Sequence, residues 1–380
     1  MAVPKPAPVR KTYYRPRRSN APLLAVGVAV LVALAVVVHH PNQARATRSP
    51  VQRLYTAVTV DPVGIVEEIK VGEFAEVEAQ IKSYQTAATL EPRAEMNLAY
   101  AFNAFALPDP AISEQLRKWA ANSPESAIAH CARAVVLEQD AALARGHEGG
   151  PTSSIPSDHF MEMEKDLSQA IMEADSARSL DPGLINAYLP AIDAAKMEAD
   201  PVAMEEASKR ALDKFPASFQ IRRALIIGME PRWGGSYDTM DKFANESQAN
   251  VAQNPALRFL LGFPAMAQAR DLQADEKWEE SIPLLDHAIE VGGDYAPFYT
   301  CRGNSYYNLK KYDDALADLR SANELMPDNA DTLETLALTA HFLRKPSDAL
   351  EYSNRYLKLG LPDKDIAEVR DWAVAQVLKH

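Results

Sequence analysis

Cysteine is scarce in this chain of 380 residues, which contains only Cys131 and Cys301. Two cysteines so far apart cannot build the dense disulfide framework that stabilises small secreted domains. Both lie in apolar helical sequence, so we expect two buried thiols and no bridge. The fold must therefore depend on a hydrophobic core, for which 47% hydrophobic residues are sufficient.

Recognisable catalytic and cofactor-binding motifs are also missing. The sequence has no H-E-x-x-H, no phosphate-binding glycine loop with its lysine and no dinucleotide fingerprint. The tetrapeptide GGSY at 234–237 lacks the preceding strand that a nucleophile elbow requires. His159 and Glu162 can share a helical face, but one such pair is typical of a solvated surface. We therefore expect no enzymatic activity, no cofactor and no metal site.

Acidic residues are absent from the first fifty positions, where eight basic residues occur: Lys5, Arg10, Lys11, Arg15, Arg17, Arg18, Arg45 and Arg48. The net charge of the whole chain is −12, so removing these eight positive charges leaves −20 for residues 51–380. Because a body this acidic repels a phosphate backbone, we expect no nucleic-acid partner.

A long apolar run follows the basic tail. Residues 21–38, APLLAVGVAVLVALAVVV, have no polar side chain, and as a helix they nearly cross the ~30 Å hydrocarbon core of a bilayer. Since basic residues precede the run, the positive-inside rule places the tail 1–20 in the cytoplasm. We expect a single-pass anchor in a bacterial inner membrane, with everything after His39 in the periplasm. The alternative is secretion after cleavage near Ala46, which ends a small-x-small tripeptide.

Beyond a linker at 39–62, the sequence has helical periodicity and no alternating strand pattern. Prolines mark most joints, but Pro190 and Pro283 fall within helical patterns, where we expect kinks. Upstream of residue 230 the predicted helices lie near 72–87, 91–106, 111–122, 125–145, 158–179, 183–198, 201–214 and 217–228. The sequence thus predicts an all-α protein.

One segment, residues 296–329, carries the marks of a 34-residue helical repeat. Aromatic and small residues stand where the two helices of such a repeat meet, and a proline ends the second helix: Tyr299, Gly303, Tyr306, Tyr312, Ala315, Ala322 and Pro327. In these residues the segment resembles the tetratricopeptide repeat. The resemblance implies paired helices in a partner-binding superhelix.

The same spacing extends in both directions without an insertion. Residues 262–295 and 330–361 place small or apolar residues at equivalent positions, and 363–380 is typical of a helix that caps the last apolar face. Three repeats and a cap suffice for a stable array. The predicted fold is an all-α, tetratricopeptide-like helical-repeat solenoid behind a single N-terminal transmembrane helix.

The resemblance also implies a concave groove, lined by the first helix of each repeat. The inward positions carry Arg270, Gln273, Thr300, Asn304, Tyr307, Asn308, Glu334, His341 and Phe342. Polar and aromatic side chains of this kind suit an extended peptide. A clamp for a C-terminal carboxylate is not expected, because Thr300 and Glu334 stand where positive charge is needed. The alternative is that these are ordinary solvated residues.

Three upstream stretches carry a second resemblance: VGEFAEVEAQIKSYQ at 71–85, PESAIAHCARAVVLEQDAALARG at 124–146 and PRWGGSYDTMDKFA at 231–244. Through them, residues 63–255 resemble the bacterial domain of unknown function family 4034. The resemblance implies a helical domain that is often joined to tetratricopeptide-like repeats in envelope or secreted proteins. It implies no known activity.

The third stretch interrupts helical sequence with Arg-Trp-Gly-Gly. Gly234 and Gly235 permit positive φ angles or a close backbone approach. Pro231 ends the helix before them, and Ser236 or Asp238 can cap the helix that follows. The stretch therefore predicts a rigid turn between two helices.

Trp233 is held on this turn, and two roles fit it. We favour packing against neighbouring helices, with Arg232 donating to helix carbonyl ends. The alternative is a ligand corner formed by Arg145, Arg232 and Trp233, in an enzyme or carbohydrate-binding module. The complete prediction is a membrane-anchored periplasmic scaffold that binds a protein or peptide partner in its helical-repeat groove.

Overall fold

The computed structural model describes residues 58–107, 109–146, 155–361 and 363–378. The predicted tail, the predicted span 21–38 and the alternative cleavage site near Ala46 lie outside these residues. No helix within the described ranges is both long and apolar enough to cross a membrane.

Seventeen α-helices make up the described part of the chain, which contains no strand. They are α1 (Pro62–Val71), α2 (Phe74–Leu90), α3 (Glu95–Asn103), α4 (Pro110–Asn122), α5 (Ala127–Arg145), α6 (Ser157–Leu180), α7 (Leu189–Glu198), α8 (Pro201–Lys214), α9 (Phe219–Gly228), α10 (Tyr237–Ser247), α11 (Phe263–Ala274), α12 (Trp278–Gly292), α13 (Ala296–Asn308), α14 (Tyr312–Leu325), α15 (Ala330–Phe342), α16 (Pro346–Lys358) and α17 (Lys364–Val377). Short 3-10 helices connect some of them: η2 (Pro92–Ala94), η3 (Ala104–Ala106), η5 (Ile185–Tyr188), η6 (Pro231–Trp233), η7 (Gln248–Asn250) and η8 (Pro255–Gly262). The prediction of an all-α protein is confirmed.

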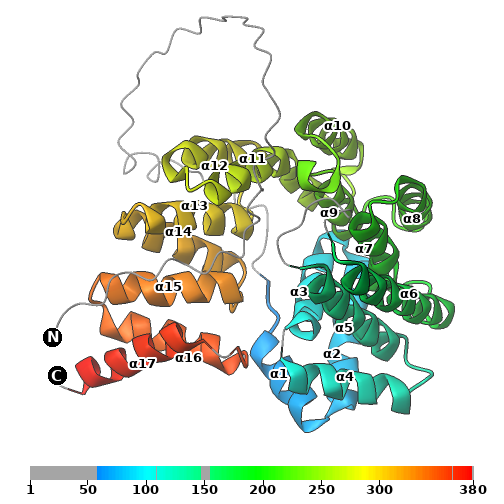
Figure 1. Ribbon diagram of the computed structural model, residues 1–380, viewed down its shortest axis with the longest axis horizontal. Helices are drawn as coiled ribbons and strands as arrows, with labels where there is room; N and C mark the ends of the chain where they lie inside the picture. The colour runs from blue at the N-terminus through cyan, green and yellow to red at the C-terminus, as the bar shows by residue number, and fades with distance from the viewer. Residues whose placement is uncertain (1–57, 108, 147–154, 362, 379–380) are drawn as a thin grey trace, which may run out of the picture.

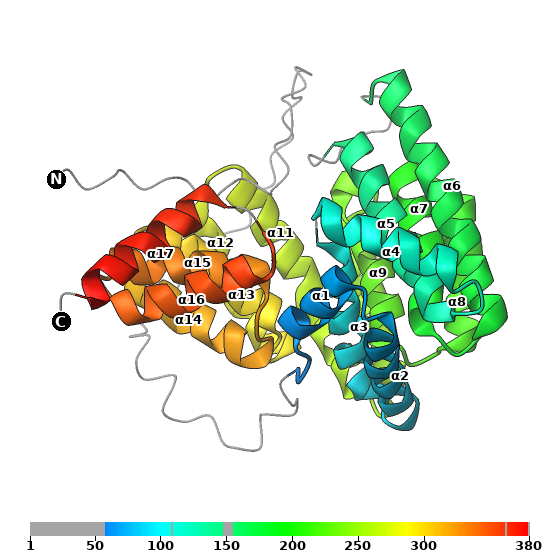
Figure 2. The same ribbon diagram turned by 90° about the horizontal axis from the view of Figure 1, so that it is seen from below.

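The helices are arranged in two halves. Figure 1 shows α11–α17 as a stack of paired helices on one side and α1–α10 on the other. The view from below in Figure 2 places α1 and α11 near the boundary between the halves. The stack therefore presents one of its faces to the upstream helices.

Several helices begin with the same two residues, aspartate and then proline. Asp61, Asp109 and Asp200 are N-caps of α1, α4 and α8, and the carboxylate of each accepts a hydrogen bond from a backbone N–H in the first turn. The proline that follows has no N–H, which costs nothing in the first turn of a helix. This short pattern fixes where these helices start.

Two features of the upstream helices differ from the sequence prediction. Helix α1 is not among the predicted segments, although its ten residues bury Ile65, Val66 and Ile69. Pro190 was predicted to kink a helix, but it lies in the first turn of α7, directly after η5. A proline there breaks no helical hydrogen bond, so the expected kink is wrong. Pro283 does lie inside α12.

The stack repeats its geometry every 34 residues. The turns after α11, α13 and α15 each contain one non-glycine residue with positive φ: Glu276 at 62°, Lys310 at 60° and Arg344 at 57°. On α13, a side chain at Gly303 would meet Leu319 Cγ at 2.7 Å. This close approach explains the small residue that the repeat pattern places where two helices meet.

A buried carboxylate joins three upstream elements. Glu95, at the start of α3, is only 1% exposed. Its oxygens accept hydrogen bonds from Ser218 Oγ at 2.7 Å, Asn254 Nδ2 at 2.7 Å and the backbone N–H of Phe219. Ser218 and Asn254 are the N-caps of α9 and η8. Burial raises the pKa of Glu95 to about 7, although these hydrogen bonds oppose the rise.

The first helices also contact the last two repeats. Tyr100 on α3 donates a 2.6 Å hydrogen bond to the carbonyl of Pro327. Lys70 of α1 pairs with Asp109 at 2.9 Å, and Gly360 of the α16–α17 turn lies against this pair, so closely that an added Cβ would collide with Lys70 Nζ. The chain thus returns from its last repeat to its first helices.

The turn at residues 231–236 has the predicted form. Gly234 has φ +93°, and Gly235 lies so close to Met229 that a side chain would collide with its carbonyl oxygen. Ser236 caps α10 through a reciprocal capping box with Thr239. Both predicted uses of the glycines are confirmed, and Ser236 rather than Asp238 is the cap.

The two glycines should respond differently to alanine. We expect Gly234→Ala to lower the free energy of unfolding by about 1 kcal/mol, because it adds only the strain of positive φ. Gly235→Ala should cost about 2 kcal/mol, since the turn must move to relieve the collision. Urea denaturation of both variants measures this difference. Equal losses would contradict the role assigned to the close backbone approach.

Candidate partner-binding groove

The predicted groove residues lie on α11, α13 and α15, the first helices of the three pairs. Gln273, Thr300, Asn304 and Tyr307 are buried. The others are partly exposed: Arg270, Asn308, Glu334, His341 and Phe342. The first helices of the three pairs therefore combine buried polar groups with half-exposed side chains.

Two of the buried side chains make contacts between neighbouring inner helices. The amide nitrogen of Gln273 donates to Cys301 O at 2.8 Å and to Ser305 Oγ at 2.7 Å. The hydroxyls of Thr300 and Thr332 lie 2.9 Å apart. Neither Gln273 nor Thr300 is solvated, so the solvated alternative does not describe these two positions.

One inner position recurs in all three pairs. Gln273, Tyr307 and His341 are spaced by 34 residues, and each has a buried polar atom without a hydrogen-bond partner: Oε1, the phenol oxygen and Nδ1. Burial raises the pKa of the Tyr307 phenol, and burial together with the charge of Arg344 lowers the pKa of His341. Because buried polar atoms are nearly always satisfied in native proteins, this polar ladder is a place where a ligand or water can bind.

A chain of aromatic contacts runs from α13 to the last helix. Tyr312 stacks on Phe342 with a centroid distance of 5.0 Å and an interplanar angle of 9°. Tyr307 lies 5.8 Å from Tyr312, and His341 packs edge-on against Trp372 of α17 at 4.3 Å. All of these aromatic residues except Tyr307 are half-buried. We call these five residues the aromatic row.

Arg270, on α11, meets the upstream half through a residue that the sequence did not single out. Glu230 is 5% exposed and lies 3.8 Å from Arg270 Nη1 and 2.6 Å from Arg232 Nε. It thereby joins a groove residue to the Trp233 corner. A single acid before a Pro-Arg sequence gives no signal of this role.

The Trp233 corner brings together residues from three helical segments. Arg145, Arg232 and Lys196 lie over the indole, with distances to the ring centroid of 4.9, 5.5 and 5.6 Å. Arg145 Nε donates to the carbonyl of Met197 at 3.2 Å. The prediction that Arg232 donates to carbonyl ends is therefore corrected: Arg145 does so, while Arg232 pairs with Glu230.

These contacts favour packing over carbohydrate binding at Trp233. The ring also packs against the apolar cluster of Ala141, Met163, Leu167, Ala194 and Met197. Sugar stacking needs a bare aromatic face, whereas cationic groups already lie over this one. The indole N–H is buried without a hydrogen-bond partner, so one donor of this corner is unsatisfied.

Replacing Trp233 tests the packing role. We expect Trp233→Ala to lower the free energy of unfolding by about 2–3 kcal/mol, less than for a fully buried tryptophan. Trp233→Phe should lose less than half as much free energy of unfolding as Trp233→Ala, because a phenyl ring still offers a face to the cations. Chemical denaturation measures both. An unchanged stability in Trp233→Ala would contradict packing and favour a ligand platform.

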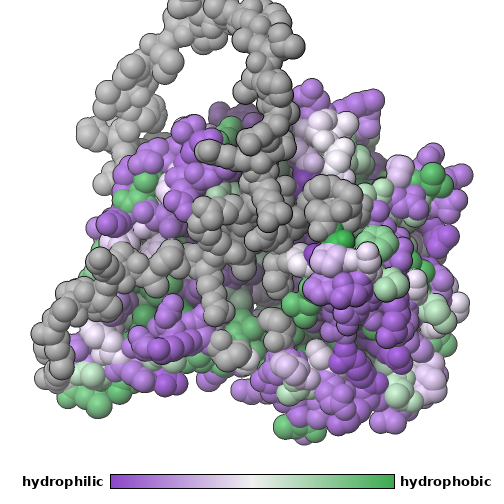
Figure 3. All heavy atoms as spheres, viewed as in Figure 1, coloured by the Kyte–Doolittle hydropathy of each residue, from purple (hydrophilic) through white to green (hydrophobic). Residues whose placement is uncertain are grey.

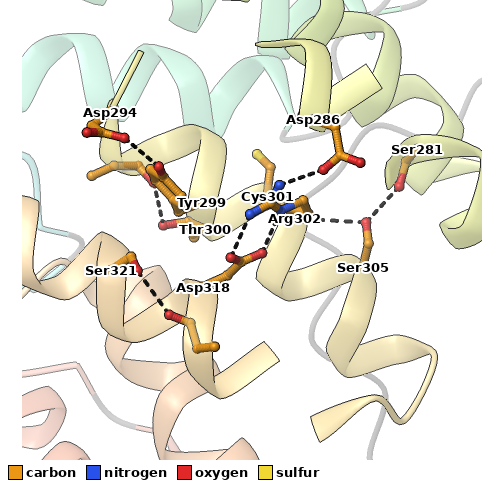
Figure 4. A network of polar contacts seen from close by, with 12 residues as sticks. Ser281, Asp286, Asp294, Tyr299, Thr300, Cys301, Arg302, Ser305, Asp318 and Ser321 are labelled. Carbon is orange, nitrogen blue, oxygen red and sulfur yellow. Dashed lines mark hydrogen bonds and ion pairs between the residues drawn. The ribbon is translucent and has the colours of Figure 1, made fainter. Parts of the chain in front are cut away.

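The repeats are also joined by ion pairs (Figure 4). Arg302 of α13 makes two hydrogen bonds to Asp318 of α14, at 2.7 and 2.8 Å, and one to Asp286 of α12 at 2.5 Å. Asp318 is 5% exposed. Burial lowers the pKa of Arg302, but the two carboxylates outweigh it and raise the pKa overall. Arg302 thus connects two successive pairs.

No group of three potential metal ligands occurs within the described ranges. Cys131 and Cys301 are free and buried, as predicted, and burial raises the pKa of both thiols. Neither thiol is poised as a nucleophile, because the reactive form is the thiolate.

Comparison with known proteins identifies one segment. The tetratricopeptide repeat family model matches residues 296–329, and no curated protein matches the chain.

Similar solved structures include pilF of Pseudomonas aeruginosa, with 12% identity over 55% of this chain and 90% of that one and a TM-score of 0.32. YrrB, a tetratricopeptide protein with an unusual peptide-binding site, has 21% identity over 67% and 96%, with a TM-score of 0.24. Yeast Tom70 has 11% identity over 84% and 96%, with a TM-score of 0.28. Scores this low carry no argument about function. On the family match and the observed helix pairs, residues 296–329 are a tetratricopeptide repeat within an all-α helical-repeat array.

Proposed function

We propose that this protein is an interaction scaffold that binds an extended segment of a protein partner along α11, α13 and α15. One observation carries the proposal: Gln273, Tyr307 and His341 each have a buried polar atom without a hydrogen-bond partner, at the same position of three successive pairs. An extended chain has backbone donors and acceptors along its whole length, so it can satisfy a ladder that one small ligand cannot span.

The membrane anchor and the periplasmic location belong to the same proposal. They are supported by the apolar run at 21–38 and by the basic residues before it. The proposal includes no catalytic activity. Residues 63–255, which resemble the domain of unknown function family 4034, are included in the proposal without a role of their own.

Site-specific photo-crosslinking tests the groove. A photoreactive phenylalanine analogue at Asn308, a half-buried groove position, is compared with the same analogue at Glu351, an exposed position on α16. In cells, we expect Asn308 to crosslink to one recurring protein and Glu351 to give no such product. The proposal fails if both positions give the same products, or if Asn308 crosslinks only within the chain.

Alkaline extraction of membranes tests the anchor separately. We expect the full-length chain to stay with the membrane pellet, whereas a variant with two charged residues at Val30 and Leu34 should be released. Protease added to spheroplasts should then degrade the repeats of the unaltered protein. Repeats that stay protected in intact spheroplasts and are degraded only after lysis would contradict a periplasmic location.

A further inference from the structure

We propose that a cavity at the boundary between the two halves binds a small aromatic amine, with its ring inside and its ammonium group at the mouth. The lining of this cavity includes none of the predicted groove residues, so the inference does not depend on the proposed function. Three observations support it: the volume of the cavity, the apolar character of its walls and the charge at its mouth.

The cavity has a volume of about 170 Å³. It lies where the segment before α1 meets η2, α3, η8, the start of α13 and the end of α14. Native cores contain few voids larger than one water molecule, and an engineered apolar cavity of about 150 Å³ binds benzene. A space of this size therefore points to an occupant of about one aromatic ring.

Two hydrogen bonds of the backbone fix one side of the cavity. The Val58 N–H donates to the carbonyl of Leu325 at 3.0 Å, and the Thr59 N–H donates to Asn97 Oδ1 at 3.0 Å. Leu325 belongs to the repeat array and Asn97 to α3, so this short segment is bound to both halves. The cavity is therefore a built part of the boundary.

Apolar side chains form most of the wall. Phe259 and Tyr295 are buried and stack on each other with a centroid distance of 4.8 Å and an interplanar angle of 26°. Met96 and Met326 are half-buried, and their flexible thioethers can adapt to a ring and contact it favourably. By contrast, the described surface in Figure 3 is mainly hydrophilic, with hydrophobic residues in small separate patches. Fixed rings together with adaptable methionines suit an aromatic ligand.

Three charged residues occur among the described residues that line the cavity: Glu91, Arg93 and Asp294. Arg93 pairs with Glu91, and both side chains are about half exposed, so they lie on the solvent side. Two carboxylates and one guanidinium give the mouth a net negative charge, which favours an ammonium group over a carboxylate. Asp294 Oδ1 accepts a 2.5 Å hydrogen bond from the Tyr299 hydroxyl, and a carboxylate can accept further bonds besides this one.

Small probes test the site on the full-length protein. Isothermal titration calorimetry compares 2-phenylethylamine with 3-phenylpropanoate, which has the same ring and the opposite charge, and with propylamine, which has the ammonium group without the ring. We expect 2-phenylethylamine to bind at least about tenfold more tightly than either. Equal binding of 3-phenylpropanoate would overturn the assignment of charge, and equal binding of propylamine that of the ring. No binding of 2-phenylethylamine overturns the inference.

Variants locate the binding in the cavity. Ala94→Leu should fill it and weaken the binding of 2-phenylethylamine at least about tenfold, whereas Ala203→Leu, at a half-buried alanine of α8, should leave binding unchanged. Asp294→Asn should weaken it about tenfold by removing a charge, whereas Asp313→Asn, at an exposed position of α14, should not. Circular dichroism confirms folding, and if one cavity variant does not fold the other still decides. Unchanged binding in a folded cavity variant overturns the assignment. Crosslinking at Asn308 tests the proposed function separately from all of these results.

Discussion

Replacing Glu95 by alanine should lower the free energy of unfolding by about 4 kcal/mol, one of the two largest losses that we expect from one substitution. The carboxylate is the acceptor for the Ser218 hydroxyl, the Phe219 N–H and the Asn254 amide, all of them buried. Alanine leaves these donors without a partner, and each unsatisfied buried donor costs about 1–3 kcal/mol. Chemical denaturation followed by circular dichroism measures the loss.

Glu95→Gln provides the matched control. The amide oxygen can keep the two bonds made by Oε1, while the amide nitrogen can donate to the Ser218 hydroxyl, which also accepts. We therefore expect a loss below about 1 kcal/mol at neutral pH. If glutamine were as destabilising as alanine, the hydrogen-bond account of this site would be wrong.

The same carboxyl group should make stability depend on pH. Its pKa is raised from 4.5 to about 7 in the folded protein, so the native state holds a proton that the unfolded state has released between these values. The stabilisation is complete below pH 4.5 and is lost as the pH rises through 7. From this group alone, the free energy of unfolding should fall by about 3 kcal/mol between pH 4.5 and 8.

Urea titrations at several pH values check this dependence. The difference between the wild-type protein and Glu95→Gln isolates the contribution of Glu95, since all other groups are common to both. We expect the wild-type protein to lose stability relative to the variant as the pH rises from 5 to 8. Parallel pH profiles would show that Glu95 titrates normally.

Arg302→Ala should lower the free energy of unfolding by about 3–5 kcal/mol, because it removes the guanidinium that pairs with the buried carboxylate of Asp318. Arg302→Lys should recover only part of this loss, since an ammonium group cannot make the paired hydrogen bonds of the guanidinium. Thermal and chemical denaturation measure both variants.

Arg320 is the control for Arg302 within the same array. It pairs with Asp348 at 2.7 Å, but its side chain is 44% exposed. We expect Arg320→Ala to cost at most about 1 kcal/mol, the usual contribution of a surface ion pair. Similar losses for Arg302→Ala and Arg320→Ala would mean that burial of Asp318 does not set the cost.

Local sequence patterns predicted most of the helices and the repeat. The spacing of Gly303 and its aromatic neighbours located residues 296–329, because these side chains contact within the same helix pair. The Gly234-Gly235 turn and the helix cap were likewise predictable from the sequence, since both depend on adjacent residues. Pro190 was misjudged because the pattern does not distinguish a helix interior from the first turn that follows a 3-10 helix.

Contacts between distant residues account for what the sequence analysis missed. Glu95 bonds to residues 123 to 159 positions away, and Glu230 joins Arg270 to Arg232. A single acid in a helical sequence is usually a surface residue, so neither Glu95 nor Glu230 could be distinguished from a surface acid. The inward places of Gln273, Tyr307 and His341 were predicted from the repeat, whereas their unpartnered atoms depend on how neighbouring helices pack.

The contact of Gly360 with Lys70 and Asp109, together with the Tyr100–Pro327 bond, has a consequence for unfolding. In an open repeat array each unit touches only its neighbours, so the ends fray independently and folding can start anywhere. Here the terminal units stabilise each other, so fraying at one end also removes contacts from the other. We expect a single cooperative transition, and slow folding, because closing a loop of this length precedes the contacts that stabilise it.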